Sequence, residues 1–123
     1  MSSQTPVVVA ESNFLTARLF QATLQGSGRE VVIGRFGDEV IRLIEQHRAR
    51  VVVLSMNLAR PSGLELLRMM QQRSLDVRVL AAIGLGQSEL KAAAGALGVR
   101  SFFELPFSPE SLVARVAELE VAS

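Results

Sequence analysis

The chain has 123 residues, of which 49% are hydrophobic and 20% are charged, and its 13 basic residues stand against 12 acidic ones. This composition is typical of one folded soluble domain and excludes a disordered chain. The net charge of +1 indicates no concentrated basic surface, so we expect no nucleic-acid binding by this segment. Because the chain has no cysteine, thiol redox chemistry and thiolate metal ligands are excluded.

Short runs of β-branched residues alternate with longer stretches whose apolar residues recur at helical spacing, which predicts βα units around a parallel sheet. In chain order we predict strand Val7–Glu11, helix Asn13–Gln25, strand Glu30–Gly34, helix Asp38–His47, strand Val51–Ser55, helix Ser62–Gln72, strand Val77–Ala82, helix Ser88–Leu97, strand Val99–Phe103 and helix Pro109–Val121. Three of these strands are nearly all apolar, which is typical of central strands covered on both faces.

Polar residues mark several helix starts. Ser62 stands three residues before Glu65, a capping box, and Ser108 directly precedes a proline at the first helical position. We interpret Ser12 and Asn13 as the N-cap region of the first helix, not as a ligand site.

The apolar runs are far shorter than the roughly 20 residues that cross a bilayer. The N-terminus has neither the positive leader nor the apolar core of a signal peptide. We therefore expect no membrane contact and a cytoplasmic location.

Five right-handed βα units of this size predict a doubly wound sheet, in which ligands bind beyond the carboxyl ends of the central strands. The loops at those ends are 11–13, 55–57, 83–86 and 104–107. Ser55 is interpreted as a strand-end serine bonded to the backbone. A nucleophilic serine needs a base, and His47, the only histidine, is predicted at the far end of the second helix.

Five short motifs follow one another along the chain: Val8-Val9-Ala10-Glu11-Ser12, Leu54-Ser55-Met56-Asn57-Leu58, Pro61-Ser62-Gly63-Leu64-Glu65-Leu66-Leu67, Leu97-Gly98-Val99 and Pro106-Phe107-Ser108-Pro109-Glu110. Together they resemble the receiver domain of two-component response regulators, over almost the whole chain. The resemblance implies a flavodoxin-like α/β fold, a doubly wound five-stranded parallel sheet in the order 2-1-3-4-5 with five helices. It also implies a regulatory domain that is not an enzyme, and a cis peptide at Leu105–Pro106.

The phosphorylation residues of that family are mostly replaced in this sequence. Receivers carry two acidic residues after the first strand and an Asp after the third strand that accepts a phosphoryl group. Glu11 matches the first acid, whereas Ser12 stands in the place of the second and Ser55 occupies the phosphoacceptor position.

Two further positions also depart from the family. Ile83 takes the place of a Thr or Ser, with Ala82 or Ala81 there if the alignment shifts, and Leu105 replaces a Lys. Mg²⁺ binding usually requires one or two carboxylates, and phosphoryl transfer depends on positioning and on charge neutralisation. We therefore predict a degenerate phosphoacceptor pocket that binds no metal or cofactor and is not switched by aspartyl phosphorylation. Its predicted members are Glu11, Ser12, Ser55, Asn57, Ala82, Ile83 and Leu105.

The resemblance implies a protein-binding face on the fourth helix, fifth strand and fifth helix, with Lys91, Arg100, Phe102 and Glu104 on it. Its expected partners are an output domain, a separate protein or a second copy of the chain. We interpret residues 1–123 as one receiver-like domain and expect it to form the N-terminal part of a longer regulator. One such longer regulator would carry a downstream helix-turn-helix domain. The role of that regulator would then be transcription regulation.

A second hypothesis is small-molecule sensing. A pocket without its acids and lined by Ala82, Ile83, Leu85 and Leu105 would admit an apolar or neutral ligand. One closed apolar cluster of these four side chains would oppose this hypothesis, and a ligand-sized cavity among them would favour it. An enzymatic function ranks third, because the predicted crevice holds no acid–base pair.

Overall fold

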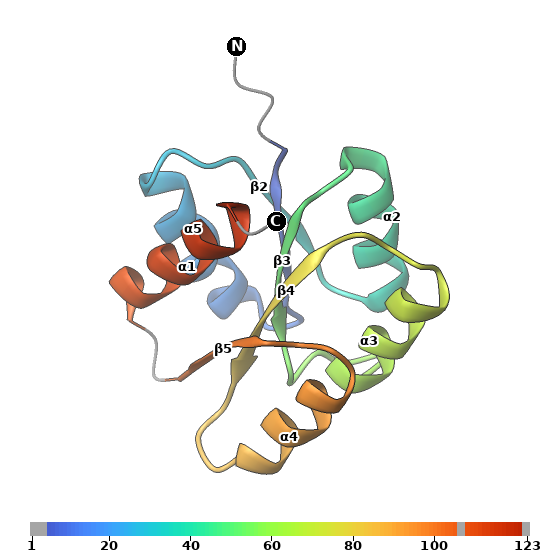
Figure 1. Ribbon diagram of the computed structural model, residues 1–123. Coiled ribbons are helices and arrows are strands. Elements are labelled where there is room, and N and C mark those ends of the chain that lie inside the picture. Colours follow the sequence, from blue (N-terminus) through green and yellow to red (C-terminus); the bar gives the residue numbers. More distant parts are fainter. Residues whose placement is uncertain (1–4, 106–107, 122–123) are drawn as a thin grey trace.

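The computed structural model describes residues 5–105 and 108–121. Within these residues, five parallel strands form one sheet in the order β2-β1-β3-β4-β5, with helices on both faces (Figure 1). The elements are β1 (Val7–Ala10), α1 (Phe14–Gly26), β2 (Val31–Gly34), α2 (Gly37–His47), β3 (Val51–Ser55), α3 (Gly63–Gln72), β4 (Arg78–Ile83), α4 (Ser88–Ala96), β5 (Ser101–Glu104) and α5 (Pro109–Val121). The predicted α/β fold and strand order are confirmed.

Two separate apolar cores lie on the two faces of the sheet, because successive strand residues point to opposite sides. On β1, Val7 and Val9 belong to the core beneath α1 and α5, whereas Val8 and Ala10 belong to the core beneath α2, α3 and α4. Figure 1 shows these two helical layers on either side of the strands. Every residue of β1 and β3 is buried, as expected of central strands.

Most predicted boundaries lie within one residue of the observed ones, and the largest difference is at β5. This strand begins at Ser101, two residues later than predicted. Gly98 adopts a left-handed φ of 96°, and the N–H of Val99 still donates to the Ala94 carbonyl of α4 at 3.1 Å. Val99 therefore lies in the turn that ends α4, although its β-branched side chain predicted a strand.

The predicted helix starts are confirmed where the structure describes them. The Asn13 side chain accepts a hydrogen bond from the Thr16 N–H at 2.9 Å, and the Ser62 Oγ accepts from the Glu65 N–H at 3.2 Å. The expected cis peptide at Leu105–Pro106 lies outside the described residues. None of the helices in the described ranges has both the length and the apolar content needed to span a bilayer.

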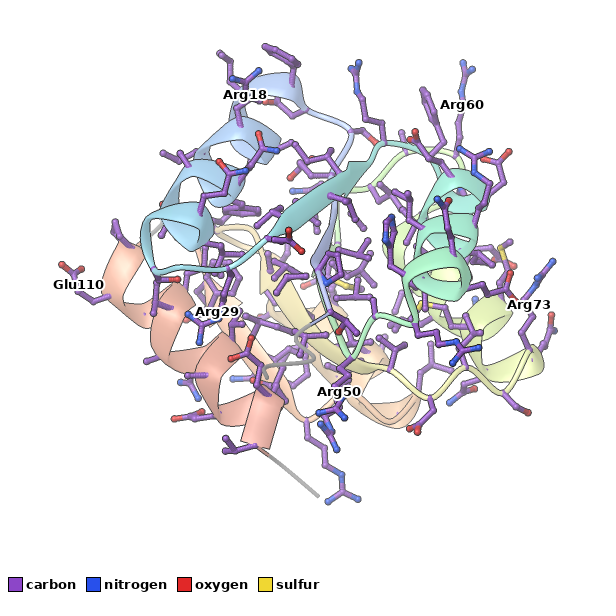
Figure 2. The ribbon with its side chains drawn as sticks, turned by 90° about the horizontal axis from the view of Figure 1, so that it is seen from above. Arg18, Arg29, Arg50, Arg60, Arg73 and Glu110 are labelled. Carbon is purple, nitrogen blue, oxygen red and sulfur yellow. The ribbon has the colours of Figure 1, made fainter. Side chains whose placement is uncertain are left out.

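The end of α5 is anchored to the loop between α1 and β2 by one ion pair. Arg29 donates from Nε and Nη2 to the two carboxylate oxygens of Glu120, at 2.9 and 2.7 Å. Figure 2 places Arg29 between this loop and α5. The hydrogen bond from Arg29 to Glu120 raises the pKa of the guanidinium, with partial burial acting in the opposite direction. Such two-point charged pairs hold a defined geometry.

This anchor generates a stability prediction. We expect Glu120→Gln to lower the free energy of unfolding by about 1 kcal/mol, because the pair is mostly shielded and makes two charge-assisted bonds. Glu118→Gln is the matched control, since Glu118 is 67% exposed and lies 3.9 Å from its partner Arg115. Urea unfolding at low and high salt measures both variants. Equal losses in the two variants would contradict the anchoring role.

Candidate functional site at the carboxyl ends of the strands

The predicted pocket lies at the sheet edge where the parallel strands end. Backbone pairing continues one residue beyond the strands here, because three N–H groups donate across neighbouring chain segments. These bonds are Glu11 N–H to Gly34 O at 3.1 Å, Met56 N–H to Ala82 O at 3.0 Å and Leu105 N–H to Ile83 O at 2.9 Å. The loops after β1, β3, β4 and β5 therefore start from one continuous backbone platform.

Glu11 supplies a buried carboxylate to this edge. Its side chain is 5% exposed, and its Oε2 accepts a hydrogen bond from the Asn13 N–H at 3.0 Å. Asn13 is the N-cap of α1, so this carboxylate lies at the positive end of a helix.

Ser12 connects three loops through its hydroxyl. The Oγ donates to the Arg35 carbonyl after β2 and accepts from the Ala59 N–H after β3, each at 2.9 Å. In return, the Arg35 guanidinium donates to the Ser12 carbonyl at 3.2 Å. Ser12 therefore performs structural work across the pocket, beyond the N-cap region in which the sequence placed it.

Ser55 ends β3 and is 2% exposed. Its Oγ accepts a hydrogen bond from the Asn57 N–H at 3.3 Å, which agrees with the interpretation of a strand-end serine bonded to the backbone. The described residues leave no buried side-chain nitrogen or oxygen atom without a hydrogen-bond partner. The buried polar side-chain atoms of this edge are therefore hydrogen-bonded within the protein.

A side-chain clasp joins the loops after β3 and β4. Gln87 donates from Nε2 to Asn57 Oδ1 at 2.7 Å, and its Oε1 accepts from the Gly84 N–H at 2.9 Å. A Cβ at position 84 would lie 2.5 Å from this Oε1, so the glycine permits the close approach. We define Asn57, Gln87 and Gly84 as the amide clasp.

The four residues proposed for a ligand pocket do not line one cavity. Ala82 and Ile83 are consecutive on β4, so they point into the two different cores. Leu105 packs against the core on the α1 and α5 side, and Leu85 is 88% exposed. The structure therefore separates the side chains on which the sensing hypothesis depended.

The chemistry available at this edge is limited. Among the residues that the structure describes, no group of three or more His, Cys, Asp or Glu side chains is arranged to hold a metal ion. Glu11 is the pocket's one carboxylate among its predicted members. His47 ends α2, and helices between parallel strands run back to the opposite edge, so it cannot serve as a base for Ser55.

The predicted binding face lies along β5, the strand at one lateral edge of the sheet. Lys91, Arg100 and Glu104 are exposed and Phe102 is half-buried. The Lys91 ammonium lies 5.5 Å from the centre of the Phe102 ring, so α4 and β5 contact each other through a cation–π pair. The structure therefore brings Lys91 and Phe102 together.

Two participants in the pocket were missed from the sequence, Gln87 and Arg35. Gln87 follows Gly84 by three residues, a spacing that suits a side chain closing its own loop, and this was the available signal. Arg35 contributes mainly its backbone carbonyl, which residue type does not reveal.

Comparison with known proteins identifies the family. The family described as the response regulator receiver domain matches residues 7–117. The alkaline phosphatase synthesis transcriptional regulatory protein PhoP of Bacillus subtilis is 28% identical over 116 residues, which cover 94% of this chain and 48% of PhoP. The polar-differentiation response regulator DivK of Brucella anthropi is 26% identical over 106 residues, which cover 83% of this chain and 85% of DivK.

A solved structure gives the same result for the fold. The crystal structure of the receiver domain of NtrX from Brucella abortus superimposes with a TM-score of 0.86 at 27% identity, covering 94% of this chain and 99% of the NtrX domain. The chain spans about half the length of PhoP. Because the family match extends over nearly the whole chain and the sheet has the same architecture, this chain belongs to the response regulator receiver domain family.

Proposed function

We propose that this receiver domain transmits signals through protein contacts and is not switched by aspartyl phosphorylation. The observation that carries the proposal is the end of β3, where a buried serine hydroxyl, bonded to the backbone N–H of Asn57, occupies the phosphoacceptor position that the family resemblance assigns. A serine hydroxyl is a weak nucleophile unless a base lies within reach.

The electrostatics of the pocket support the same conclusion. Mg²⁺ takes oxygen ligands and usually requires one or two carboxylates. Glu11 is the pocket's carboxylate, and one of its oxygens already accepts from the helix N-cap residue. The transferred phosphoryl group also needs cations to neutralise its oxygens, and at the lysine position Leu105 packs into an apolar core. The groups that would accept the phosphoryl group, hold the metal ion and neutralise the phosphoryl oxygens are therefore all replaced or reduced in this pocket.

The hydrogen bonds around the pocket favour one fixed arrangement of the loops. The Ser12 hydroxyl bonds to the loops after β2 and β3, and the amide clasp joins the loops after β3 and β4. A two-state switch requires a ligand that prefers one of two loop arrangements. These hydrogen bonds within the chain take the place of such a ligand. They support a scaffold with one permanent shape.

The partner-binding surface that we propose is formed by α4, β5 and α5. The outer strand β5 has a neighbour only in β4, so one row of its backbone groups faces away from the sheet. Exposed charged residues of both signs lie near this edge. Lys91 and Arg100 are basic, and Glu104 is acidic. Mixed charge around an open strand suits a protein partner of complementary charge.

For the whole protein we propose the role of a bacterial regulator with an output domain. The relative PhoP is named a transcriptional regulatory protein and is about twice as long as this chain's match to it. An output domain would supply DNA binding, and the receiver domain described here would supply the protein contacts. We propose a cytoplasmic location for this regulator.

The first prediction concerns Mg²⁺ and beryllofluoride, a mimic of the phosphoryl group. We expect no saturable amide NMR shifts at Glu11, Ser12 or Ser55, because the pocket lacks the charges that hold the metal and the mimic. Saturable, Mg²⁺-dependent shifts at these three residues would refute the proposal.

A restored variant supplies the positive control. Ser12→Asp, Ser55→Asp and Leu105→Lys together return two carboxylates and an ammonium to the pocket, and we expect this variant to bind the mimic with Mg²⁺. Single Ser55→Asp is a milder version that disturbs one hydrogen bond at the pocket. If the natural chain and a folded restored variant respond alike, the replaced residues do not determine phosphorylation.

The second prediction concerns the binding face and takes a second copy of the chain as its partner. We expect Lys91→Glu to weaken self-association measured by sedimentation equilibrium by about fivefold, the scale of one exposed charge contact. Arg18→Glu is the matched control, because Arg18 also lies over a ring, 5.6 Å from Phe14, and projects outward from α1 away from α4 and β5 (Figure 2). Association that depends on Arg18 and not on Lys91, or a chain that stays monomeric at millimolar concentration, would contradict dimer formation by this face.

A further inference from the structure

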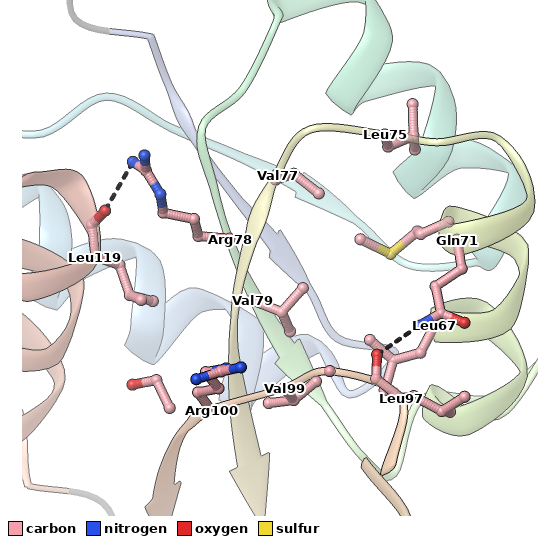
Figure 3. A pocket seen from close by; sticks show the side chains of 13 residues that line it. Leu67, Gln71, Leu75, Val77, Arg78, Val79, Leu97, Val99, Arg100 and Leu119 are labelled. Carbon is pink, nitrogen blue, oxygen red and sulfur yellow. Dashed lines mark hydrogen bonds between the residues drawn. The ribbon is translucent and has the colours of Figure 1, made fainter. Parts of the chain in front are cut away.

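A cavity of about 340 Å³ lies between the end of α3 and the starts of β4 and β5. It is at the amino ends of the strands, at the opposite edge of the sheet from the phosphoacceptor pocket. Figure 3 shows its apolar wall beside the first residues of β4. This wall is formed by Leu67, Met70, Val77, Val79, Leu97 and Val99.

The late start of β5 creates this cavity. Pairing between β4 and β5 begins with Leu80 opposite Ser101, so the first residues of β4 have no strand beside them on the β5 side. Val77 and Val79 consequently remain half-buried, although they pack against the core on the α3 side. Covering apolar surface of this kind with a ligand removes it from water, which makes the free energy of binding more favourable.

Two hydrogen bonds fix the rim of the cavity before any ligand arrives. Gln71 Nε2 donates to the Leu97 carbonyl at 2.7 Å, which ties the loop after α4 to α3. Arg78 Nη1 donates to the Leu119 carbonyl at 3.0 Å, which ties β4 to the end of α5. Both bonds are drawn in Figure 3. A preformed rim lowers the ordering cost of binding.

The charged groups that line the cavity are two arginines, Arg78 and Arg100, and its lining contains no acidic residue. Neither arginine forms an ion pair among the residues described in the structure. Arg78 also lines a second cleft together with Arg50, Asp76 and Glu120, and Glu120 is paired with Arg29. Arg100 thus offers the cavity a guanidinium with N–H donors to spare, whereas the Arg78 guanidinium is directed toward Leu119 (Figure 3).

We propose that this cavity binds a small amphipathic carboxylate. Its apolar part would cover Val77, Val79 and Val99, and its carboxylate would accept hydrogen bonds from Arg100. The volume falls at the lower end of the range for small-molecule sites, which suits a short acyl or aryl chain. The proposal does not rest on the fate of the phosphoacceptor pocket.

Amide NMR titration with octanoate, below the concentration at which it forms micelles, tests the proposal. We expect saturable shifts confined to Leu67, Val79, Gly98 and Arg100. The neutral probe 1-octanol should bind at the same residues about fivefold more weakly, because it lacks the charge that pairs with arginine. Shifts that do not saturate, or that spread to exposed apolar residues such as Leu15 and Leu85, would overturn the proposal.

Two arginine variants separate the charge contribution from general folding effects. Arg100→Gln should weaken octanoate binding about fivefold and leave 1-octanol binding unchanged. Arg115→Gln is the matched control, since Arg115 is exposed on α5 and does not line the cavity. An equal effect of the two variants on octanoate, or an equal loss of both probes in Arg100→Gln, would overturn the assignment of the carboxylate to Arg100.

Discussion

The burial of β3 on both faces is the constraint on which the rest of the molecule depends. All of its residues are buried, and they alternate between two cores that different helices cover. A polar group at the end of such a strand must be satisfied by neighbouring protein groups, because water does not reach it freely. One serine hydroxyl meets this requirement with a single backbone N–H, whereas several carboxylates crowded together would need a cation between them. The serine at this position and the bonded loops around it are therefore consistent with each other.

The elements were predictable because local signals agreed with the global fold. Capping residues marked α1 and α3, and proline marked the start of α5, so these boundaries follow from a few side chains. The strand order followed from the family resemblance and not from periodicity. β5 was placed too early because Val99 has strand propensity, whereas the backbone of Gly98 and the bond to Ala94 keep this segment in a turn.

The site was predictable in its members and not in its connections. The amide clasp joins residues 30 positions apart, and their meeting depends on the register of β3 and β4. Alternation along β4 separated Ala82 from Ile83, a consequence of strand geometry that a count of apolar residues near the pocket does not reveal. The cavity at the amino ends arises from the unequal lengths of two neighbouring strands, and uncertainty of one or two residues in a boundary is enough to hide it.

The short outer strands have a consequence for the behaviour of the domain at high concentration. β2 and β5 flank the sheet and are each four residues long. A neighbouring molecule that added a strand to either margin would gain only a few backbone hydrogen bonds, too few to propagate a fibre. Assembly through these margins would therefore depend on side chains of the adjacent helices more than on added strands.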